Sequence, residues 1–402
     1  MIHLETPKKF RPLVDQAHQV AREIFRANSR KYDRAEHAYP KELDMLASVM
    51  DGMDEAGARG GAGASGVRRD AQVSEGNKNG SNLSTCLGIM ELCWGDVGLL
   101  LAMPRQGLGN SAIASVANEE QLQRFAGRWA AMAITEPGCG SDSANIRTTA
   151  VLDGDHYVLN GEKIYVTSGD RADLVVVWAT LDRAKGRAAI KSFVVEKGTP
   201  GFELVRLEHK LGIRASDTAA FVLKDCRVPR ENLLGDPEVN VEKGFAGVMQ
   251  TFDNTRPLVA SMAVGLTRAC LEHTAKVLKD AGITVDYDRP ALTQNSAAAT
   301  LLALEADYEA ARLLTLQAAW MADNRKPNSL QASMAKAKAG RTCVDVALKC
   351  VEICGALGYS EQALLEKWAR DAKILDIFEG TQQIQLLIVA RRLLGKTSAE
   401  LK

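Results

Sequence analysis

The spacing of apolar residues along the 402-residue chain changes twice, and this change most limits the folds open to it. From residue 1 to about 125, and again from about 238 to 402, apolar residues recur with the period of amphipathic helices. Between about 126 and 237 they alternate with polar residues, as in half-buried strands. The pattern predicts an α+β protein with an N-terminal helical domain, a middle β domain and a C-terminal helical bundle.

Individual elements can be predicted from the same pattern. Helices are expected over 10–25, 40–53, 83–103, 245–279, 297–322, 329–357 and 384–394. Strands are expected over 174–178, 192–195, 202–207 and 219–223. The dipeptide Asn160-Gly161, flanked by the alternating segments 156–159 and 162–167, is a strong hairpin signal and predicts a two-residue turn.

A glycine-rich polar stretch at 57–80 interrupts the early helices and predicts a mobile loop. It contains Gly61, Gly63 and Gly66 in the order G-x-G-x-x-G of a dinucleotide-binding turn. Such a turn needs a preceding strand and a following amphipathic helix, and the sequence predicts neither here. We therefore interpret this match as fortuitous.

Charge and cysteine content argue against several classes of function. Lysine plus arginine and aspartate plus glutamate both number 50, so the zero net charge argues against general binding to nucleic acids or acidic membranes. The eight cysteines form no C-x-x-C pair; we interpret them as reduced core residues of a cytoplasmic protein, and we expect no metal site. No apolar run approaches the ~18 residues needed to span a bilayer, and the N-terminus lacks the features of a signal peptide.

The strongest catalytic candidate is Glu379, in the stretch 371–392. It follows an apolar run and precedes Gly380 and Thr381, which suit a backbone turn and the N-cap of a helix. A carboxylate on an apolar wall can act as a base, because desolvation raises its proton affinity. The alternative is an ordinary acidic residue that faces a helix dipole.

Three motifs occur in order along the chain. They are Ile134-Thr135-Glu136-Pro137-Gly138-Cys139-Gly140-Ser141-Asp142, then Ile164-Tyr165-Val166-Thr167, then Ile377-Phe378-Glu379-Gly380-Thr381. Together they closely resemble the acyl-CoA dehydrogenase family, which residues 210–215 and 224–235 also fit. The resemblance runs from about 35 to 395 and implies domains at 1–125, 126–237 and 238–402, the second barrel-like and the third a four-helix bundle.

The resemblance implies that FAD is the cofactor of this chain. A glycine-rich loop such as 134–142 can bring N–H groups and hydroxyls against a planar ligand. By the resemblance, residues 132–141 line the flavin ring, Thr135 bonds to its polar edge, Tyr165 packs on it and Thr167 bonds near N5; two strand residues at this spacing are expected to share a face. The full set implied to contact FAD is Met132, Ile134, Thr135, Gly140, Ser141, Tyr165, Val166, Thr167, Thr381 and Gln383.

The resemblance also assigns Ser141, Asp253, Arg256 and Gly380 to the acyl-CoA substrate. Asp253 and Arg256 would hold the nucleotide and pantetheine parts of CoA, and a guanidinium suits phosphate because it presents paired donors. The alternative for these two residues is a surface ion pair on a helix.

Glu379 is implied to remove the α-proton of the thioester while the β-hydride passes to flavin N5. Its backbone N–H would stabilise the charge that develops on the thioester oxygen, and burial by the acyl chain should raise the pKa of Glu379. Some relatives place the base on the earlier helix, but the matching residue here, Thr255, cannot serve. The product would be a trans-2-enoyl-CoA, and the electrons would pass to an electron-transfer flavoprotein.

Two departures from the family pattern fall where homotetramers contact the FAD of a neighbouring subunit. Residues 284–288 replace a motif that usually supplies an Arg, and Glu352 stands where the family usually has Gln. An acid there would repel a diphosphate. We therefore expect a related partner subunit, as in the α2β2 acyl-CoA dehydrogenases of actinobacteria; the alternative is a homo-oligomer with weakened FAD binding.

Two other functions stay open on the same fold. One is a flavin-dependent acyl-CoA oxidase or monooxygenase, although monooxygenase members generally lack the Glu base. The other is a non-catalytic, nucleic-acid-binding relative, against which the zero net charge and the lack of a basic tract argue. No motif marks the acyl chain length, so fatty and steroid side-chain CoA esters are both open.

Overall fold

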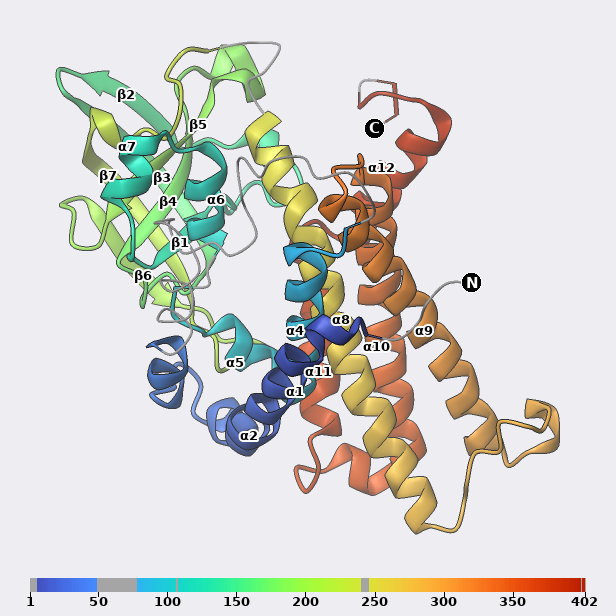
Figure 1. Ribbon diagram of the computed structural model, residues 1–402. Coiled ribbons are helices and arrows are strands. Elements are labelled where there is room, and N and C mark those ends of the chain that lie inside the picture. The colour runs from blue at the N-terminus through green and yellow to red at the C-terminus, as the bar shows by residue number, and fades with distance from the viewer. Residues whose placement is uncertain (1–5, 49–77, 106–107, 240–245, 399, 402) are drawn as a thin grey trace.

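The computed structural model describes residues 6–48, 78–105, 108–239, 246–398 and 400–401, with the backbone alone for 246–254. A curled sheet lies on one side of the molecule, and long helices pack side by side on the other (Figure 1). Helices, sheet and helices follow one another along the chain in the predicted order.

The N-terminal part is helical, as predicted. Its helices are α1 (Arg11–Val20), which continues through a π-helical turn (Ala21–Arg26) into α2 (Ala27–Arg34), then α4 (Ser81–Gly95), α5 (Val97–Leu101), α6 (Leu108–Val116) and α7 (Glu119–Arg124), and residues 42–48 are also helical. Asp96 separates α4 from α5, because its own backbone is extended and its side chain caps α5. The expected loop at 57–80, with its three-glycine match, lies outside the described residues up to residue 77.

The middle part is a seven-stranded sheet with the order β1-β4-β2-β3-β7-β6, in which β5 also pairs with β4. The strands are β1 (Ala130–Ala133), β2 (Thr149–Asp153), β3 (His156–Thr167), β4 (Leu174–Thr180), β5 (Ile190–Glu196), β6 (Phe202–Leu207) and β7 (Thr218–Pro229). All four strands expected over 174–223 are confirmed, whereas β1 and β2 were not predicted. β1 is short and nearly all buried, so it has no alternating pattern to detect.

The hairpin predicted at Asn160-Gly161 is wrong. Both residues lie inside β3, and the chain turns earlier, at Gly154-Asp155 between β2 and β3. The pairing of β3 with β7 shifts register at Gly161, whose φ is 154°. A Cβ at Gly161 would lie 2.7 Å from Cα of Thr148, so this glycine allows a bulge and a close approach of two chains, not a turn.

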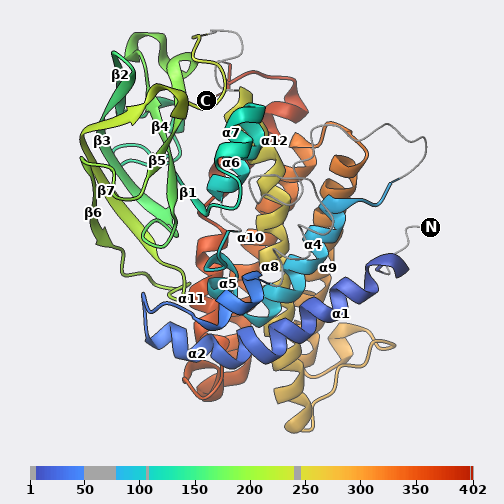
Figure 2. The same cartoon turned by 60° about the vertical axis from the view of Figure 1, so that its left-hand side comes forward.

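The C-terminal part is a bundle of long helices. They are α8 (Ala246–Asp280), α9 (Ser296–Asp323), α10 (Ser329–Tyr359), α11 (Leu365–Leu375) and α12 (Gln382–Leu394), with short 3-10 turns elsewhere at Lys8–Phe10, Ser143–Asn145, Arg183–Ala189, Arg230–Asn232 and Ala291–Thr293. The turned view shows α6 and α7 between the sheet and α8 (Figure 2). α11 was not predicted from the sequence, although Leu365, Trp368, Ala372 and Leu375 recur at helical spacing on its buried face.

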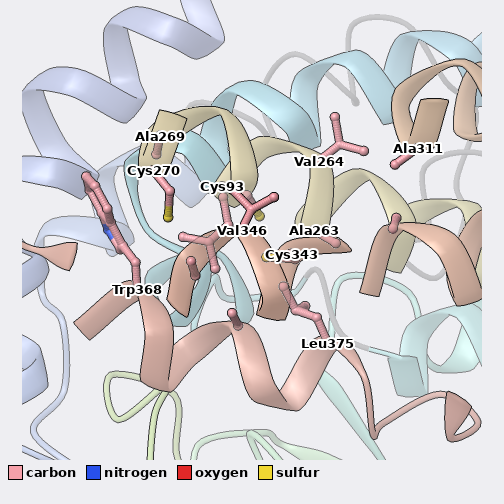
Figure 3. Packing of buried hydrophobic residues seen from close by; sticks show 14 of the residues in the cluster. Cys93, Ala263, Val264, Ala269, Cys270, Ala311, Cys343, Val346, Trp368 and Leu375 are labelled. Carbon is pink, nitrogen blue, oxygen red and sulfur yellow. The ribbon is translucent and has the colours of Figure 1, made fainter. Parts of the chain in front are cut away.

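Small and sulfur-containing side chains fill the centre of the bundle, where α4, α8, α10 and α11 meet. Cys93, Cys270, Cys343 and Trp368 all belong to this buried cluster (Figure 3). All eight cysteines are free and buried, as predicted for core residues, and burial raises the pKa of Cys343 to about 12. Within the described part of the chain, no helix has the length and apolar character needed to cross a membrane.

A buried cluster of charges joins the helices to the sheet. Lys367 forms ion pairs with Asp96 and, at 2.6 Å, with Asp371. Asp371 also accepts a hydrogen bond of 2.6 Å from the backbone N–H of Ile213, in the loop between β6 and β7. Beside it, a Cβ on Gly212 would lie 2.6 Å from the backbone of α11, so the loop approaches the helix too closely for a side chain.

Removal of the central cation tests this cluster. Lys367→Met leaves Asp96 and Asp371 without a counter-charge in the core, and we expect the free energy of unfolding to fall by roughly 3–5 kcal/mol. The control is Lys349→Met, whose partner Glu352 is exposed and whose loss should change stability by less than about 1 kcal/mol. Urea denaturation followed by circular dichroism measures both variants. Equal losses of unfolding free energy in the two variants would show that the buried cluster contributes no more to stability than a surface ion pair.

Candidate active site

The glycine-rich loop 134–142 follows β1 and turns back on itself. Glu136 and Cys139 exchange two backbone hydrogen bonds of 3.1 Å across this turn. Thr135 is half-buried, whereas Gly140 and Ser141 are exposed. A Cβ added at Gly140 would meet no heavy atom within 4 Å, so the loop faces open space on that side.

The side chain of Glu136 fixes this loop to the sheet. It accepts hydrogen bonds from the backbone N–H groups of Arg147 at 2.6 Å and Thr148 at 2.9 Å, and it pairs with Lys163 of β3 at 2.7 Å. The side chain of Lys163 is fully buried. Burial alone would raise the pKa of Glu136, but the Lys163 ammonium and the other donors outweigh it and hold that pKa below its usual value.

The first two motifs lie side by side. The N–H of Ile164 donates a hydrogen bond of 2.9 Å to the carbonyl oxygen of Thr135. The next residue, Tyr165, has a φ of 58° and a side chain that is 62% exposed, which is unusual for a large aromatic residue. β3 shifts register between Lys163 and Val166, so the regular alternation from which a shared face of Tyr165 and Thr167 was predicted is interrupted at Tyr165, and the shared face stays a prediction.

The open loop and the exposed ring of Tyr165 fit a planar aromatic cofactor. Gly140 leaves room for a ligand beside the loop, and the exposed face of Tyr165 offers a surface for stacking. At the start of α12, the side-chain oxygen of Gln382 is buried and has no hydrogen-bond partner among the described residues, so it can accept one from a ligand. Its neighbour Gln383 is exposed.

Glu379 lies on a strained turn between α11 and α12. Its φ is 55° and that of Gly380 is 93°, and a non-glycine residue in this region costs roughly 1–3 kcal/mol. The turn is held from two sides: Lys336 of α10 donates to the carbonyl oxygen of Gly380 at 2.6 Å, and Gln385 donates to that of Glu379 at 3.1 Å. Thr381 caps α12 by accepting from Ile384 N–H, as predicted.

Glu379 is half-buried, and its carboxyl group has a polar partner. Thr255 of α8 donates a hydrogen bond of 3.0 Å to its Oε2. Burial raises the pKa of Glu379, and the hydrogen bond from Thr255 and the charges of Lys336 and Arg256 offset this only in part. Burial also lowers the pKa of Lys336 to about 8. The group is therefore a carboxylate of raised basicity, with the electrostatic properties of a general base.

Arg256 lies inside the bundle, with 3% of its surface exposed, and its charge acts on Glu379. This burial does not fit the alternative of a surface ion pair, and the side chain of Asp253 lies outside the described residues. Sequence reasoning dismissed Thr255 as a base and missed its contact with Glu379. It also missed Lys336, although a lysine among alanines in a long apolar helix marks a buried charge that needs a partner.

The site thus consists of two groups of residues. The sheet brings 134–136 next to 163–164, and the bundle gathers Thr255, Lys336 and Arg256 around Glu379. The hydrogen bond between Ile213 and Asp371 ties the sheet to the same helix, α11, that leads into the Glu379 turn.

Comparisons with known proteins cover most of the chain. Residues 131–226 match the middle domain of acyl-CoA dehydrogenases, and residues 242–394 match their C-terminal domain. A short-chain specific acyl-CoA dehydrogenase of Clostridium acetobutylicum is 34% identical over 326 residues, which are 79% of this chain and 84% of that one. The CarC subunit of the caffeyl-CoA reductase-Etf complex of Acetobacterium woodii is 32% identical over 331 residues, 80% and 85% of the two chains. The solved structure of butyryl-CoA dehydrogenase from Megasphaera elsdenii aligns with a TM-score of 0.81 at 29% identity, over 98% of this chain and 100% of that one.

The hydrogen bond from Thr255 can be tested by titration. It favours the charged form of Glu379, so Thr255→Val should raise the pKa of Glu379 further, whereas Thr255→Ser keeps the hydroxyl and should leave it close to the wild-type value. ¹³C NMR of protein labelled at the Glu carboxyl carbon measures this pKa, with Glu379→Gln to assign the signal. A Val variant that titrates like the wild type would refute the contact.

Proposed function

This chain belongs to the acyl-CoA dehydrogenase family, and from this premise we propose that it converts an acyl-CoA thioester into its trans-2-enoyl-CoA with Glu379 as the base. The proposal rests on one observation above others: a desolvated carboxyl group of raised pKa on a strained, doubly held turn. Such a turn keeps the carboxylate in a fixed place before any substrate arrives.

The residues around Glu379 define what it can do. An α-proton of a thioester is a very weak acid, so the base must be deprotonated, strong and close. Desolvation makes Glu379 a stronger base than an exposed carboxylate, and the hydroxyl of Thr255 orients it. The backbone N–H of Glu379 is the proposed donor to the thioester oxygen, where charge develops as the proton leaves.

FAD is the cofactor of the family and, when bound, supplies the acceptor for the hydride that leaves the β-carbon. We propose that loop 132–141 and residues 165–167 hold its ring, with Thr381 and Gln383 contributing from α12. The contact of Ile164 with Thr135 and the exposed ring of Tyr165 support this placement. The strain at Tyr165 keeps its ring outside the sheet, where a ligand can reach it.

The proposed substrate is a CoA thioester with a short acyl chain. Two of the relatives named above are short-chain or butyryl-CoA enzymes, which favours such a chain over a steroid side-chain ester. Ser141, Gly380 and Arg256 are its proposed contacts in the described part of the chain, and Asp253 is proposed from the sequence alone. A panel of acyl-CoA and steroid side-chain CoA esters assayed with the purified protein would decide.

The proposed electron acceptor is an electron-transfer flavoprotein. The relative CarC is named as a subunit of a reductase-Etf complex, which supports association of this fold with such a partner. The eight free cysteines support a reducing, cytoplasmic compartment. Hydrogen peroxide formed in stoichiometric amounts during turnover in air would instead indicate an oxidase.

We also propose that a related subunit completes the FAD site. Glu352 is exposed and pairs with Lys349, three residues away, and Asp286 and Asp288 lie on the exposed loop after α8. An acidic surface of this kind would repel the diphosphate of FAD. Large apolar residues of α12, namely Leu386, Leu393 and Leu394, are 52%, 67% and 66% exposed, which supports their burial by another subunit.

Substitution of the base tests the proposed reaction. Glu379→Gln keeps the shape of the side chain but cannot accept a proton, so kcat should fall by at least ~10²-fold while FAD stays bound. Glu203→Gln, an exposed residue of β6, serves as the control and should keep full activity. Activity is measured with an artificial electron acceptor, and FAD content from the visible spectrum. A Gln variant as active as the control would place the base elsewhere.

Expression without a partner tests the proposed assembly. If a related subunit supplies the contacts to the FAD diphosphate, the purified chain alone should contain far less than one FAD per chain. Co-expression with a related acyl-CoA dehydrogenase subunit from the same genome should restore FAD. Full and tight FAD occupancy of the chain alone, with a single homo-oligomeric species in size-exclusion chromatography, would refute the heteromer.

A further inference from the structure

Two histidines and a carboxylate gather at the junction of the N-terminal helices with the sheet, away from Glu379. Glu36 and His37 follow α2, and His209 follows β6. One possible ligand atom of each lies within 4.8 Å of the other two. His209 Nδ1 is 2.9 Å from Glu36 Oε2, and the ring centroids of His37 and His209 are 5.1 Å apart.

His37 is held through its backbone, because Arg171 donates to its carbonyl oxygen at 3.5 Å, but its ring nitrogens lack a hydrogen-bond partner in the described part of the chain. It is not a glycine, yet its φ is 69°, which is costly for such a residue. Both of its ring nitrogens are buried, and neither has a hydrogen-bond partner among the described residues. A native protein seldom leaves two such atoms unsatisfied, because each loses its hydration without compensation. An external partner that binds imidazole nitrogen would satisfy one of them.

We propose that Glu36, His37 and His209 bind a divalent transition metal ion of the zinc(II), cobalt(II) or nickel(II) type. Imidazole and carboxylate are donors that these ions prefer, and three protein ligands leave a position for water. In tetrahedral zinc sites the ligand atoms lie roughly 3.3 Å apart, so this cluster has to contract on binding. The side chain of His209 is 84% exposed, so it can move inward. The side chain of Glu36 is only 16% exposed and has less room to move.

The charges around the cluster permit a cation. Glu36 keeps Oε1 on the backbone N–H of Lys210 at 2.9 Å, which leaves Oε2 as the metal ligand. The nearby cations already have partners: Lys210 Nζ donates to the carbonyl of Ser216 at 2.8 Å, and Arg171, which also donates to the carbonyl oxygen of His37, pairs with Asp217 at 3.2 Å. Their charge still opposes a metal ion, so binding will be weaker than in an all-protein zinc cage.

A metal ion here would tie two distant parts of the chain together. It would clip the end of α2 to the segment just before Gly212, which packs on the backbone of α11. Because the ligands are not preassembled in the unfolded chain, binding would stabilise the folded protein. None of the three ligands is among the residues proposed for the reaction, so failure of this proposal would leave the proposed reaction untouched.

Cobalt(II) titration of the untagged full-length chain tests this proposal. We expect one Co²⁺ per chain, seen as visible d–d absorption with the intensity of a tetrahedral site, and a Tm that rises when Zn²⁺ is added. His209→Ala and His37→Ala should lose both responses. The control is His156→Ala, because His156 is also next to an acidic residue, Asp155 at 2.5 Å, but has no third ligand among the residues that the structure describes.

His209 is exposed, so its alanine variant should fold, and a circular dichroism spectrum confirms this before titration. Loss of binding in the His209 variant with binding kept in the His156 variant supports the proposal. A wild-type chain that binds no Co²⁺, or a His209 variant that binds like the wild type, overturns it.

Discussion

The ammonium group of Lys367 is surrounded by the carboxylates of Asp96 and Asp371, and the arrangement of the whole protein depends on this contact. Asp96 ends α4 and caps α5, so the cation is tied to the N-terminal helices. Asp371 binds the N–H of Ile213, so the cation is tied to the sheet as well. A buried charge is stable only when its partners are in place. The contacts of Lys367 and Asp371 therefore require α4, α11 and the loop between β6 and β7 to pack in one arrangement.

The same helix carries this geometry to the reactive group. α11 holds Lys367 and Asp371 on its buried face and ends just before the turn at Glu379. That turn combines two unfavourable features, a left-handed backbone and a desolvated carboxyl group, which the contacts from Lys336, Gln385 and Thr255 sustain. Backbone strain and desolvation at this turn both lower the stability of the folded protein. In return, they hold the carboxyl group of Glu379 in a fixed position with a raised proton affinity.

Apolar periodicity predicted the long helices and the order of the three parts because burial of one face dominates their stability. The same reasoning failed where another effect decided. Gly161 was predicted to lie in a turn, but it lies in a β-bulge. A glycine is needed there because Thr148, just before the neighbouring strand β2, packs too closely for a Cβ. The strand β1 is too short and too fully buried to show an alternating pattern, because residues on both of its faces are buried.

Only part of the candidate site could be predicted from the sequence. Glu379, the N-cap at Thr381 and the adjacency of the first two motifs could be placed from the sequence, and the roles of the FAD and substrate residues stay predictions. The partners of Glu379 could not be found this way. Thr255 and Lys336 are 124 and 43 positions away from it along the chain, and only the packing of α8 and α10 brings them together. The bulge at Tyr165 depends likewise on the pairing of β3 with β7.

The contact between Lys367 and Asp96 joins residues 271 positions apart, and this separation has a consequence for synthesis on the ribosome. The sheet, whose strands lie between residues 130 and 229, can close while the bundle is still unmade. The first helices emerge earlier, but Asp96 must wait for its counter-ion until nearly the whole chain has been translated. During that interval a desolvated aspartate would be unfavourable, so we expect the N-terminal helices to stay hydrated and loosely packed until α11 has been made.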